Sequence, residues 1–321
     1  MRAVVLSEFG PPEQLALAEI PDPVAGPGQV VLSVEFAGVT FVETQIRSGH
    51  PPHPAMAPSL PAVLGNGVGG TVIASGPGAM PVLAGQQFVT TTGGSGGYAE
   101  LVAVPVAELI PVPEGMALDQ AVALLADGRT AMALMQSADI KPGEIVLVEA
   151  AAGGVGSLLV QLARNAGATV VATAGGPRKA EAAAGLGATV AVDYRDPEWP
   201  ELVAAAVGSV DVVFDGVGGA VGAAAFRLLG DGGRISMFGM ASGSFTAVPE
   251  SEIAGRRITV VRGVPVTPDL MQELTVAALD AAAAGELRPV IGQRFGLADA
   301  AQAHAAIEGR STIGKTLLTV R

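Results

Sequence analysis

The residues best suited to bind a ligand form a glycine-rich turn, Ala151-Ala152-Gly153-Gly154-Val155-Gly156, directly after the apolar run at 145–148. Glycines let the backbone approach a phosphate oxygen closely, and the free N–H groups at a helix start attract an anion. The apolar residues after the turn recur at helical spacing, which predicts an amphipathic helix. Strand, turn and helix in this order predict a pyrophosphate site for a dinucleotide. A tight turn that binds no ligand is the alternative interpretation.

The segment after the next apolar run, 169–173, bears on which dinucleotide binds. An NAD enzyme usually places an Asp or Glu here, on the ribose 2′-hydroxyl. This chain has Ala174-Gly175-Gly176-Pro177 followed by Arg178 and Lys179. No carboxylate in this segment would repel a 2′-phosphate, and two cations follow, so the sequence favours NADPH over NADH. The alternative is that both cations only form a solvated face, although a helix start favours acids.

Other kinds of chemistry find few suitable residues. Zinc takes about four ligands, whereas the chain has no cysteine and three histidines, His50, His53 and His304. The first two lie in a proline-rich stretch, and packing is the expected role of His304 in an alanine-rich helix. There is no Gly-x-Ser-x-Gly nucleophile motif. We therefore expect no metal site, and we expect the chemistry to reside mainly in the bound cofactor.

Composition and charge exclude several partners. Half of the 321 residues are hydrophobic, 15% are charged and the formal net charge is −12, which argues against nucleic-acid binding. No charged residue occurs at 48–99, but the many Pro and Gly residues there exclude a membrane-spanning helix of roughly 20 residues. This stretch is expected to form an apolar substrate mouth. The N-terminal run reaches an acid too early for a secretory signal, so a cytoplasmic location is expected.

The distribution of strand-like and helical patterns divides the chain. Short β-like runs separated by Pro-Gly turns fill 1–119 and predict a small twisted β domain. Six apolar strands alternate with helical segments at 120–261 and predict a doubly wound parallel sheet. The tail, 262–321, predicts helices near 270–284 and 297–307 and a last strand, KTLLTV. We expect this tail to return to the first domain, with the active site in the cleft between the two domains.

Several segments together resemble the medium-chain dehydrogenase/reductase superfamily, and most of all its zinc-free quinone oxidoreductase (ζ-crystallin-like) branch, over essentially the whole chain. They are GVTFVE at 38–43, Arg47-Ser48-Gly49, the glycine turn with its helix, Asp193-Tyr194-Arg195, and the ending from Ala303 to Lys315. The resemblance implies an α/β fold, with a GroES-like catalytic domain at 1–119 and 262–321 and a Rossmann NADPH-binding domain at 120–261. It also implies a homodimer formed through edge strands of the nucleotide domain.

The same resemblance implies three groups of cofactor contacts. The pyrophosphate would be held by Gly153, Gly154, Val155 and Gly156. The 2′-phosphate would be gripped by Lys179, Tyr194 and Arg310, with Gly175 beside them. The nicotinamide and its ribose would be surrounded by Thr130, Val217, Phe238 and Gly239.

The chain departs from its relatives around the expected substrate. Thr40 and Glu43 stand where relatives often have Asn and Asp, Pro51 replaces a common tyrosine, and Gly67 stands where Glu is usual. The substrate pocket is therefore expected to be a variant, and proton donation by the missing tyrosine is in doubt. Thr40 and Gln45 are candidate catalytic contacts near the reacting carbon, with simple packing as the alternative.

These observations predict an NADPH-dependent oxidoreductase that transfers a hydride to a small apolar electrophile, either a quinone or an α,β-unsaturated carbonyl compound. The developing negative charge on the substrate oxygen needs one or two donors, such as Thr40 or a backbone N–H, and water could supply the proton. The alternatives are an enoyl-thioester reductase, a catalytically inert NADPH-binding protein and a zinc alcohol dehydrogenase.

Overall fold

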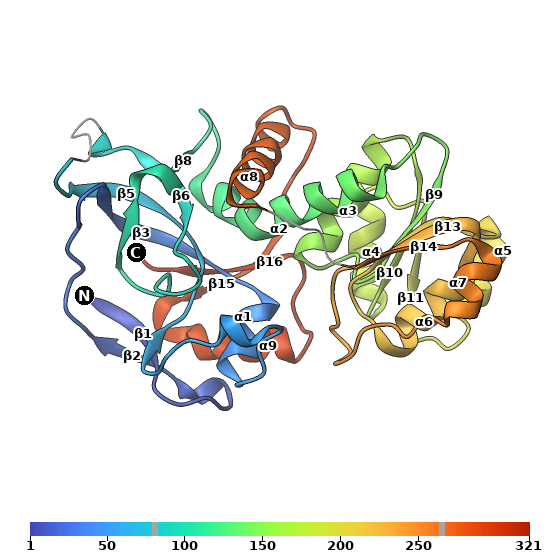
Figure 1. Ribbon diagram of the computed structural model, residues 1–321, viewed down its shortest axis with the longest axis horizontal. Coiled ribbons are helices and arrows are strands. Elements are labelled where there is room, and N and C mark those ends of the chain that lie inside the picture. The colour runs from blue at the N-terminus through green and yellow to red at the C-terminus, as the bar shows by residue number, and fades with distance from the viewer. Residues whose placement is uncertain (79–82, 263–266) are drawn as a thin grey trace. The chain divides into compact units, whose positions relative to one another are not determined.

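The chain folds into two units, each with its own sheet. The computed structural model describes residues 1–78, 83–262 and 267–321 (Figure 1). Unit 1 comprises Met1–Ala126, Thr275–Ala284 and Pro289–Arg321, and unit 2 comprises Asp127–Leu274 and Gly285–Arg288. The division falls inside two helices, α2 (Leu118–Ala138) and α8 (Pro268–Ala283). These boundaries differ from the expected limits at 119 and 261. A boundary inside a continuous helix leaves no break in the sequence pattern, so the sequence does not mark it.

Unit 1 contains a mostly antiparallel seven-stranded sheet and a three-stranded sheet. In the larger sheet β16 pairs antiparallel with β3, with Leu317 opposite Gly38, so the end of the chain completes the sheet begun near its start. Its strands are β3 (Gln29–Val39), β5 (Gly67–Ser75), β6 (Gln87–Thr91), β7 (Leu101–Pro105), β8 (Ile110–Pro111), β15 (Ile291–Gly296) and β16 (Lys315–Thr319). The smaller sheet contains β1 (Arg2–Leu6), β2 (Leu15–Glu19) and β4 (Ala62–Val63).

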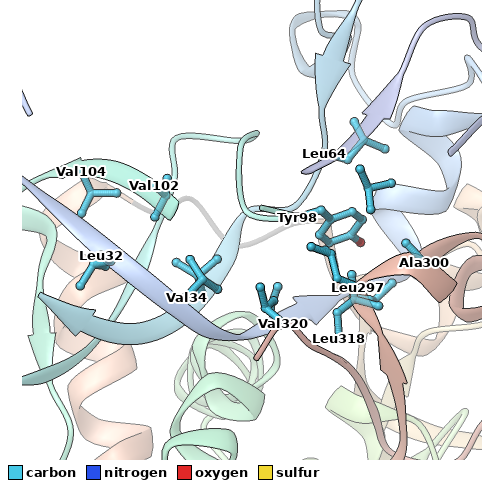
Figure 2. Close-up of a cluster of buried hydrophobic side chains, with 14 of the residues drawn as sticks. Leu32, Val34, Leu64, Tyr98, Val102, Val104, Leu297, Ala300, Leu318 and Val320 are labelled. Carbon is cyan, nitrogen blue, oxygen red and sulfur yellow. The ribbon is translucent and has the colours of Figure 1, made fainter. Parts of the chain in front are cut away.

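The core of unit 1 lies against β3. Alternate residues of a strand point to one face, and Val30, Leu32 and Val34 are completely buried. Burying each such side chain contributes about 1.5–3 kcal/mol. Figure 2 shows Leu32 and Val34 in this cluster together with the ring of Tyr98. A phenol in an apolar core needs a hydrogen-bond partner for its hydroxyl, so we expect Tyr98 to contact a polar group.

Unit 2 contains a six-stranded, fully parallel sheet with the strand order β11-β10-β9-β12-β13-β14. This confirms the predicted doubly wound sheet. The order reverses between β9 and β12, and ligands of such sheets bind outside the carboxyl ends of the strands at this reversal. The strands are β9 (Ile145–Val148), β10 (Thr169–Ala174), β11 (Val190–Asp193), β12 (Val210–Asp215), β13 (Leu229–Met237) and β14 (Thr259–Arg262).

The helices of unit 2 bury an apolar face of this sheet. Leu147, Val171 and Val213 stand at the same level in three adjacent strands and share a core with Trp199 and Phe226 from two helices. Trp199 lies in α5 and Phe226 lies in α6. The helices that lie wholly in unit 2 are α3 (Gly154–Asn165), α4 (Pro177–Gly185), α5 (Trp199–Val207), α6 (Gly219–Leu228) and α7 (Glu250–Arg256). Unit 1 has α1 (Phe41–Arg47) and α9 (Ala300–Glu308), with short 3₁₀ turns η1 (Pro12–Gln14), η2 (Pro54–Met56), η4 (Val106–Glu108) and η5 (Leu297–Asp299).

Across the described part of the chain, every helix is too short or too polar to span a bilayer.

Candidate functional site

The glycine turn of unit 2 has the geometry that an anion site requires. Gly153 is the residue before the first turn of α3, where N–H groups lack partners within the helix. A Cβ atom on Gly156 would lie 2.3 Å from the carbonyl oxygen of Ala150, so only glycine allows the helix to approach the strand end this closely. Ala151 N–H donates to the carbonyl of Thr173, which ties the turn to β10. Backbone contacts therefore fix the position of the turn, and α3 begins directly after it.

Asp127 contacts this turn, which sequence analysis did not foresee. A Cβ atom on Gly154 would lie 2.0 Å from Asp127 Oδ2, so Gly154 leaves room for this carboxylate. A negative charge at a helix N-terminus is favourable. Thr130 lies three residues further along α2 and thus near the same face of that helix. The contact of Thr130 with the nicotinamide or its ribose stays a prediction, and only tertiary packing reveals Asp127.

The predicted 2′-phosphate residues of unit 2 come together at the carboxyl ends of β10 and β11. A Cβ atom on Gly175 would lie 2.6 Å from the hydroxyl oxygen of Tyr194, so the glycine loop packs directly against the phenol. Lys179 lies in the first turn of α4, and its N–H donates to the carbonyl of Gly176. Arg310 follows α9 in unit 1, with a φ of 51°, and its role in phosphate binding stays a prediction.

A carboxylate does lie beside this loop, although the sequence segment after β10 contains none. Asp193 ends β11, and its Oδ1 accepts hydrogen bonds from the N–H groups of Gly176 at 2.8 Å and Arg195 at 3.0 Å. The Arg195 guanidinium lies 2.9 Å from Asp193 Oδ2, and its hydrogen bonds hold the pKa of Asp193 below the usual range. The negative charge is therefore paired. The run Asp-Tyr-Arg is the signal that could have identified Arg195 as part of the site.

The predicted nicotinamide residues Val217, Phe238 and Gly239 lie together at the carboxyl ends of β12 and β13. The carbonyl oxygen of Asp215 accepts from the N–H groups of Phe238 at 3.0 Å and Gly239 at 3.2 Å. A Cβ atom on Gly239 would lie 2.6 Å from the carbonyl oxygen of Gly216, so the two segments touch through their backbones. The turn that carries Val217 is thus fixed to the end of the neighbouring strand.

In unit 1, Thr40 and Glu43 form the N-terminal cap of α1. The backbone N–H of Thr40 donates to Glu43 Oε2 at 2.6 Å, and the N–H of Glu43 donates to Thr40 Oγ1 at 3.4 Å. The Thr40 hydroxyl also faces Glu43 Oε2 at 3.2 Å. Such a reciprocal cap explains the residue types at both positions, since it satisfies N–H groups that a helix start leaves open. Gln45 lies half-buried on the same helix.

Glu43 connects this helix to a buried polar cluster. Its carboxylate also accepts from the N–H of Asn66 at 2.9 Å and from the Tyr98 hydroxyl at 3.1 Å. Burial raises the pKa of Glu43, while these donors and the charge of Lys315 lower it. Gly38 makes room for Lys315, because a Cβ atom there would lie 3.3 Å from Lys315 Cε. The charged form of Glu43 is therefore well supplied with donors.

His304 completes the cluster through Tyr98, whose hydroxyl lies 3.1 Å from His304 Nε2 (Figure 2 shows the Tyr98 ring in its apolar surroundings). Burial, and secondarily the charge of Arg47, lower the pKa of His304 to about 3, so its ring is neutral near pH 7. A carboxylate only accepts hydrogen bonds, so Tyr98 donates to Glu43 and His304 donates to Tyr98. His304 therefore packs in the core, as expected, and also orients a hydrogen-bond chain.

The two other histidines, His50 and His53, are exposed, and Nδ1 of His53 accepts from the N–H of Ala55. Within residues 1–78, 83–262 and 267–321, no three His, Asp or Glu side chains come close enough together to hold a metal ion.

Fold and site together define a two-domain nucleotide-dependent enzyme scaffold, and comparisons with known proteins agree. Residues 26–114 match the GroES-like domain of alcohol dehydrogenases, and residues 186–318 match the zinc-binding dehydrogenase family. A 2-haloacrylate reductase from a Burkholderia species is 33% identical, with 98% of each chain covered. A quinone oxidoreductase from Pseudomonas aeruginosa is 30% identical, with 99% of each chain covered. The solved quinone oxidoreductase of Escherichia coli in complex with NADPH has a TM-score of 0.89 at 29% identity, with both chains fully covered.

The chain belongs to the medium-chain dehydrogenase/reductase superfamily, in its zinc-free quinone oxidoreductase branch. It is an oxidoreductase.

Proposed function

We propose that this protein is an NADPH-dependent reductase of quinones or α,β-unsaturated carbonyl compounds. The cofactor, when bound, supplies the hydride. The protein's own residues bind and orient it: the turn at 153–156 holds the pyrophosphate, Gly175, Lys179 and Tyr194 hold the 2′-phosphate, and Val217, Phe238 and Gly239 lie at the nicotinamide. The solved Escherichia coli relative binds NADPH, which supports this choice of cofactor.

The observation that carries the proposal is the arrangement after β10. The loop at Gly175 packs against the Tyr194 hydroxyl, and Lys179 follows in the first turn of α4. The nearby carboxylate, Asp193, is already neutralised by Arg195. An additional phosphate group would thus meet positive charge and N–H donors rather than an uncompensated acid, which favours a 2′-phosphate over a 2′-hydroxyl.

Reversal of one charge tests this assignment. Lys179→Glu should weaken NADPH binding by about tenfold or more, equivalent to about 1.4 kcal/mol, and change NADH binding far less, because only NADPH carries the 2′-phosphate. Arg227→Glu is the matched control, since this exposed arginine on α6 of the same unit changes the net charge equally. Fluorescence titration of both nucleotides measures the effect. Equal losses for the two nucleotides in K179E would remove Lys179 from the 2′-phosphate site.

For the substrate, we propose a small apolar electrophile contacted by Thr40 and Gln45. A hydride would add to the β-carbon of an enone or to the quinone ring system, and the electron pair displaced onto the oxygen would be neutralised by a proton from water. The hydroxyl of Thr40 makes long hydrogen bonds with Glu43, 3.2 Å and 3.4 Å, which supports its exchange of this partner for a developing negative oxygen.

The similarity to a 2-haloacrylate reductase favours compounds with a conjugated double bond as substrates. Oxidation of NADPH, followed by its absorbance, should therefore be compared for quinones, enones, 2-haloacrylates and enoyl thioesters. Turnover of enoyl thioesters alone would favour the thioester reductase. Tight NADPH binding without turnover of any of these compounds would favour a catalytically inert NADPH-binding protein.

We also propose a cytoplasmic homodimer, in which an edge strand of the unit 2 sheet, β11 or β14, pairs with its copy. Analytical ultracentrifugation of the purified protein tests the dimer, and a monomer at micromolar concentration would contradict it.

A further inference from the structure

Two carboxyl groups lie buried side by side in unit 2, at the point where the strand order reverses. Glu149 directly follows β9, and Asp215 is the last residue of β12. Both side chains have 0% exposure to solvent. Buried acids are rare unless they are paired with a cation or a donor, so this arrangement needs a physical explanation.

The register of the sheet places the two acids next to each other. Val148 stands opposite Phe214 on one side and opposite Ala172 on the other, so the following residues, Glu149, Asp215 and Thr173, form the next row. This row has the same parity as Leu147, Val171 and Val213, which face the core that includes α5 and α6. All three polar side chains are therefore directed toward that covered side of the sheet.

Each acid uses one oxygen to hold the turn that follows β12. Glu149 Oε2 accepts the N–H of Val217 at 3.0 Å, and Asp215 Oδ1 accepts the N–H of Gly218 at 2.7 Å. The carbonyl of Val217 in turn accepts from the N–H of Ser242 at 2.8 Å. The position of Val217 is thus determined by the two acids on one side and by the 242 loop on the other.

The remaining oxygens of the pair lack a donor. Glu149 Oε1 and Asp215 Oδ2 have no hydrogen-bond partner within the described part of the chain. Two adjacent buried carboxylates cannot both stay ionised, whereas one proton between them supplies the missing donor. Burial, and then the charge of Asp215, raise the pKa of Glu149 well above its usual value. Gly218 caps α6, whose N-terminus favours the negative charge on Asp215, so the proton belongs on Glu149.

We propose that Glu149 and Asp215 share one proton at neutral pH, and that this pair is the positioning device for the Asp215–Gly218 turn at the nicotinamide end of the cofactor. The inference rests on the proposed function only where it assigns Val217 to the nicotinamide. Loss of the shared proton leaves two adjacent negative charges, which repel each other and release the turn. Affinity for NADPH therefore falls as pH rises.

The neighbouring side chains from β10, α6 and the loop before α7 add no ionisable group to this pair. Thr173 faces it from β10, Gly222 from α6 and Thr246 from the loop before α7, and none of these three side chains ionises. A Cβ atom on Gly222 would lie 1.8 Å from Thr246 Oγ1 and 2.8 Å from Asp215 Oδ2, so the helix is packed tightly over the acid. This packing keeps water from replacing the proton as a donor.

The test compares wild type with Glu149→Gln, measured at about pH 6 and about pH 9, on either side of neutral pH. Glutamine imitates the protonated acid, because its oxygen can accept from Val217 and its NH₂ can donate to Asp215, but it cannot lose a proton. Glu201→Gln is the control, since Glu201 is an exposed acid on α5 of the same unit. One measurement is the thermal unfolding midpoint without cofactor, and the other is the NADPH dissociation constant by fluorescence.

We expect wild type and E201Q to lose more thermal stability than E149Q between the two pH values. We expect their NADPH affinity to fall by about tenfold while that of E149Q changes by less than about threefold, as removal of a proton from a buried hydrogen-bonded pair implies. Parallel pH dependence of unfolding in wild type and E149Q would overturn the shared proton. A stability difference without an affinity difference would overturn the positioning role.

Failure of the proposed function gives a different result. A protein that binds no NADPH at either pH contradicts that function and the positioning role, while the unfolding comparison still decides whether the proton is shared. If E149Q does not fold, Asp215→Asn provides the same test, because it removes the negative charge that Glu149 faces.

Discussion

The two units bury a glutamate each, and the two environments are opposite. Glu43 in unit 1 is 4% exposed and is surrounded by donors from Thr40, Asn66 and Tyr98, with Lys315 adding positive charge. Glu149 in unit 2 is fully buried beside a second acid, Asp215. Burial raises the pKa of both glutamates, but the neighbouring groups oppose that shift at Glu43, whereas Asp215 adds to it at Glu149.

Burial alone does not determine the charge of an acid. The polar neighbours decide whether the anion or the neutral acid is the better-bonded form. At Glu43 every hydrogen-bond partner donates, which suits an anion. At Glu149 one partner is itself an acceptor, which suits a proton. Three predictions test this contrast in unit 1, in addition to the pH test at Glu149.

The largest effect is expected from Glu43→Ala. The change leaves the N–H groups of Thr40 and Asn66 and the Tyr98 hydroxyl without their common acceptor, and it leaves the buried Lys315 without that negative charge. We expect unit 1 to lose about 3 kcal/mol or more of unfolding free energy, because each buried donor left without an acceptor costs about 1–3 kcal/mol. Urea unfolding measures it. The exposed Glu201→Ala is the control, and a loss in E43A no larger than in this control would show that Glu43 is not held as an anion.

The next effect is an acid sensitivity caused by His304. Its pKa is about 3 in the folded protein, below the usual 6.5 of an imidazole, so the unfolded chain binds this proton more readily. Its contribution to stability is present above pH 6.5 and is lost as pH falls from about 6.5 toward about 3, by up to about 1.4 kcal/mol per pH unit. Urea unfolding across this range should show a shallower decline in His304→Gln. The exposed His50→Gln should behave like wild type, and equal slopes in all three proteins would contradict the assignment.

The smallest effect is expected at Thr40. Thr40→Ala removes the side-chain half of the α1 cap and should cost about 1 kcal/mol. Thr40→Ser keeps the hydroxyl and should restore most of that stability, as measured by thermal unfolding. If Thr40 also contacts the substrate, kcat should fall in T40A and recover in T40S. A loss of stability in T40A with an unchanged kcat would assign Thr40 to the cap alone.

Much of unit 2 could be predicted from the sequence because its signals are local. A strand, the glycine turn and a helix follow each other within about twenty residues. The strand and the helix each show a hydrophobic period that backbone geometry sets. Gly154, Gly156 and Gly175 mark places where a Cβ atom would collide, so the residue type itself reports the close approach. In unit 1, β15 was not predicted, because it alternates weakly between half-buried and exposed residues.

The doubly wound sheet, the glycine turn before α3 and the cation-rich segment after β10 could be predicted from the sequence, since periodicity and glycine placement act over short distances along the chain. The sequence does not show which polar groups meet in the folded protein. Tyr98 reaches His304 across 206 positions, and Glu149 meets Asp215 because the strand order places β12 beside β9. Hydrogen bonds and charges act over a few ångströms in space, so the partners that set the state of a buried acid come from the order of the strands.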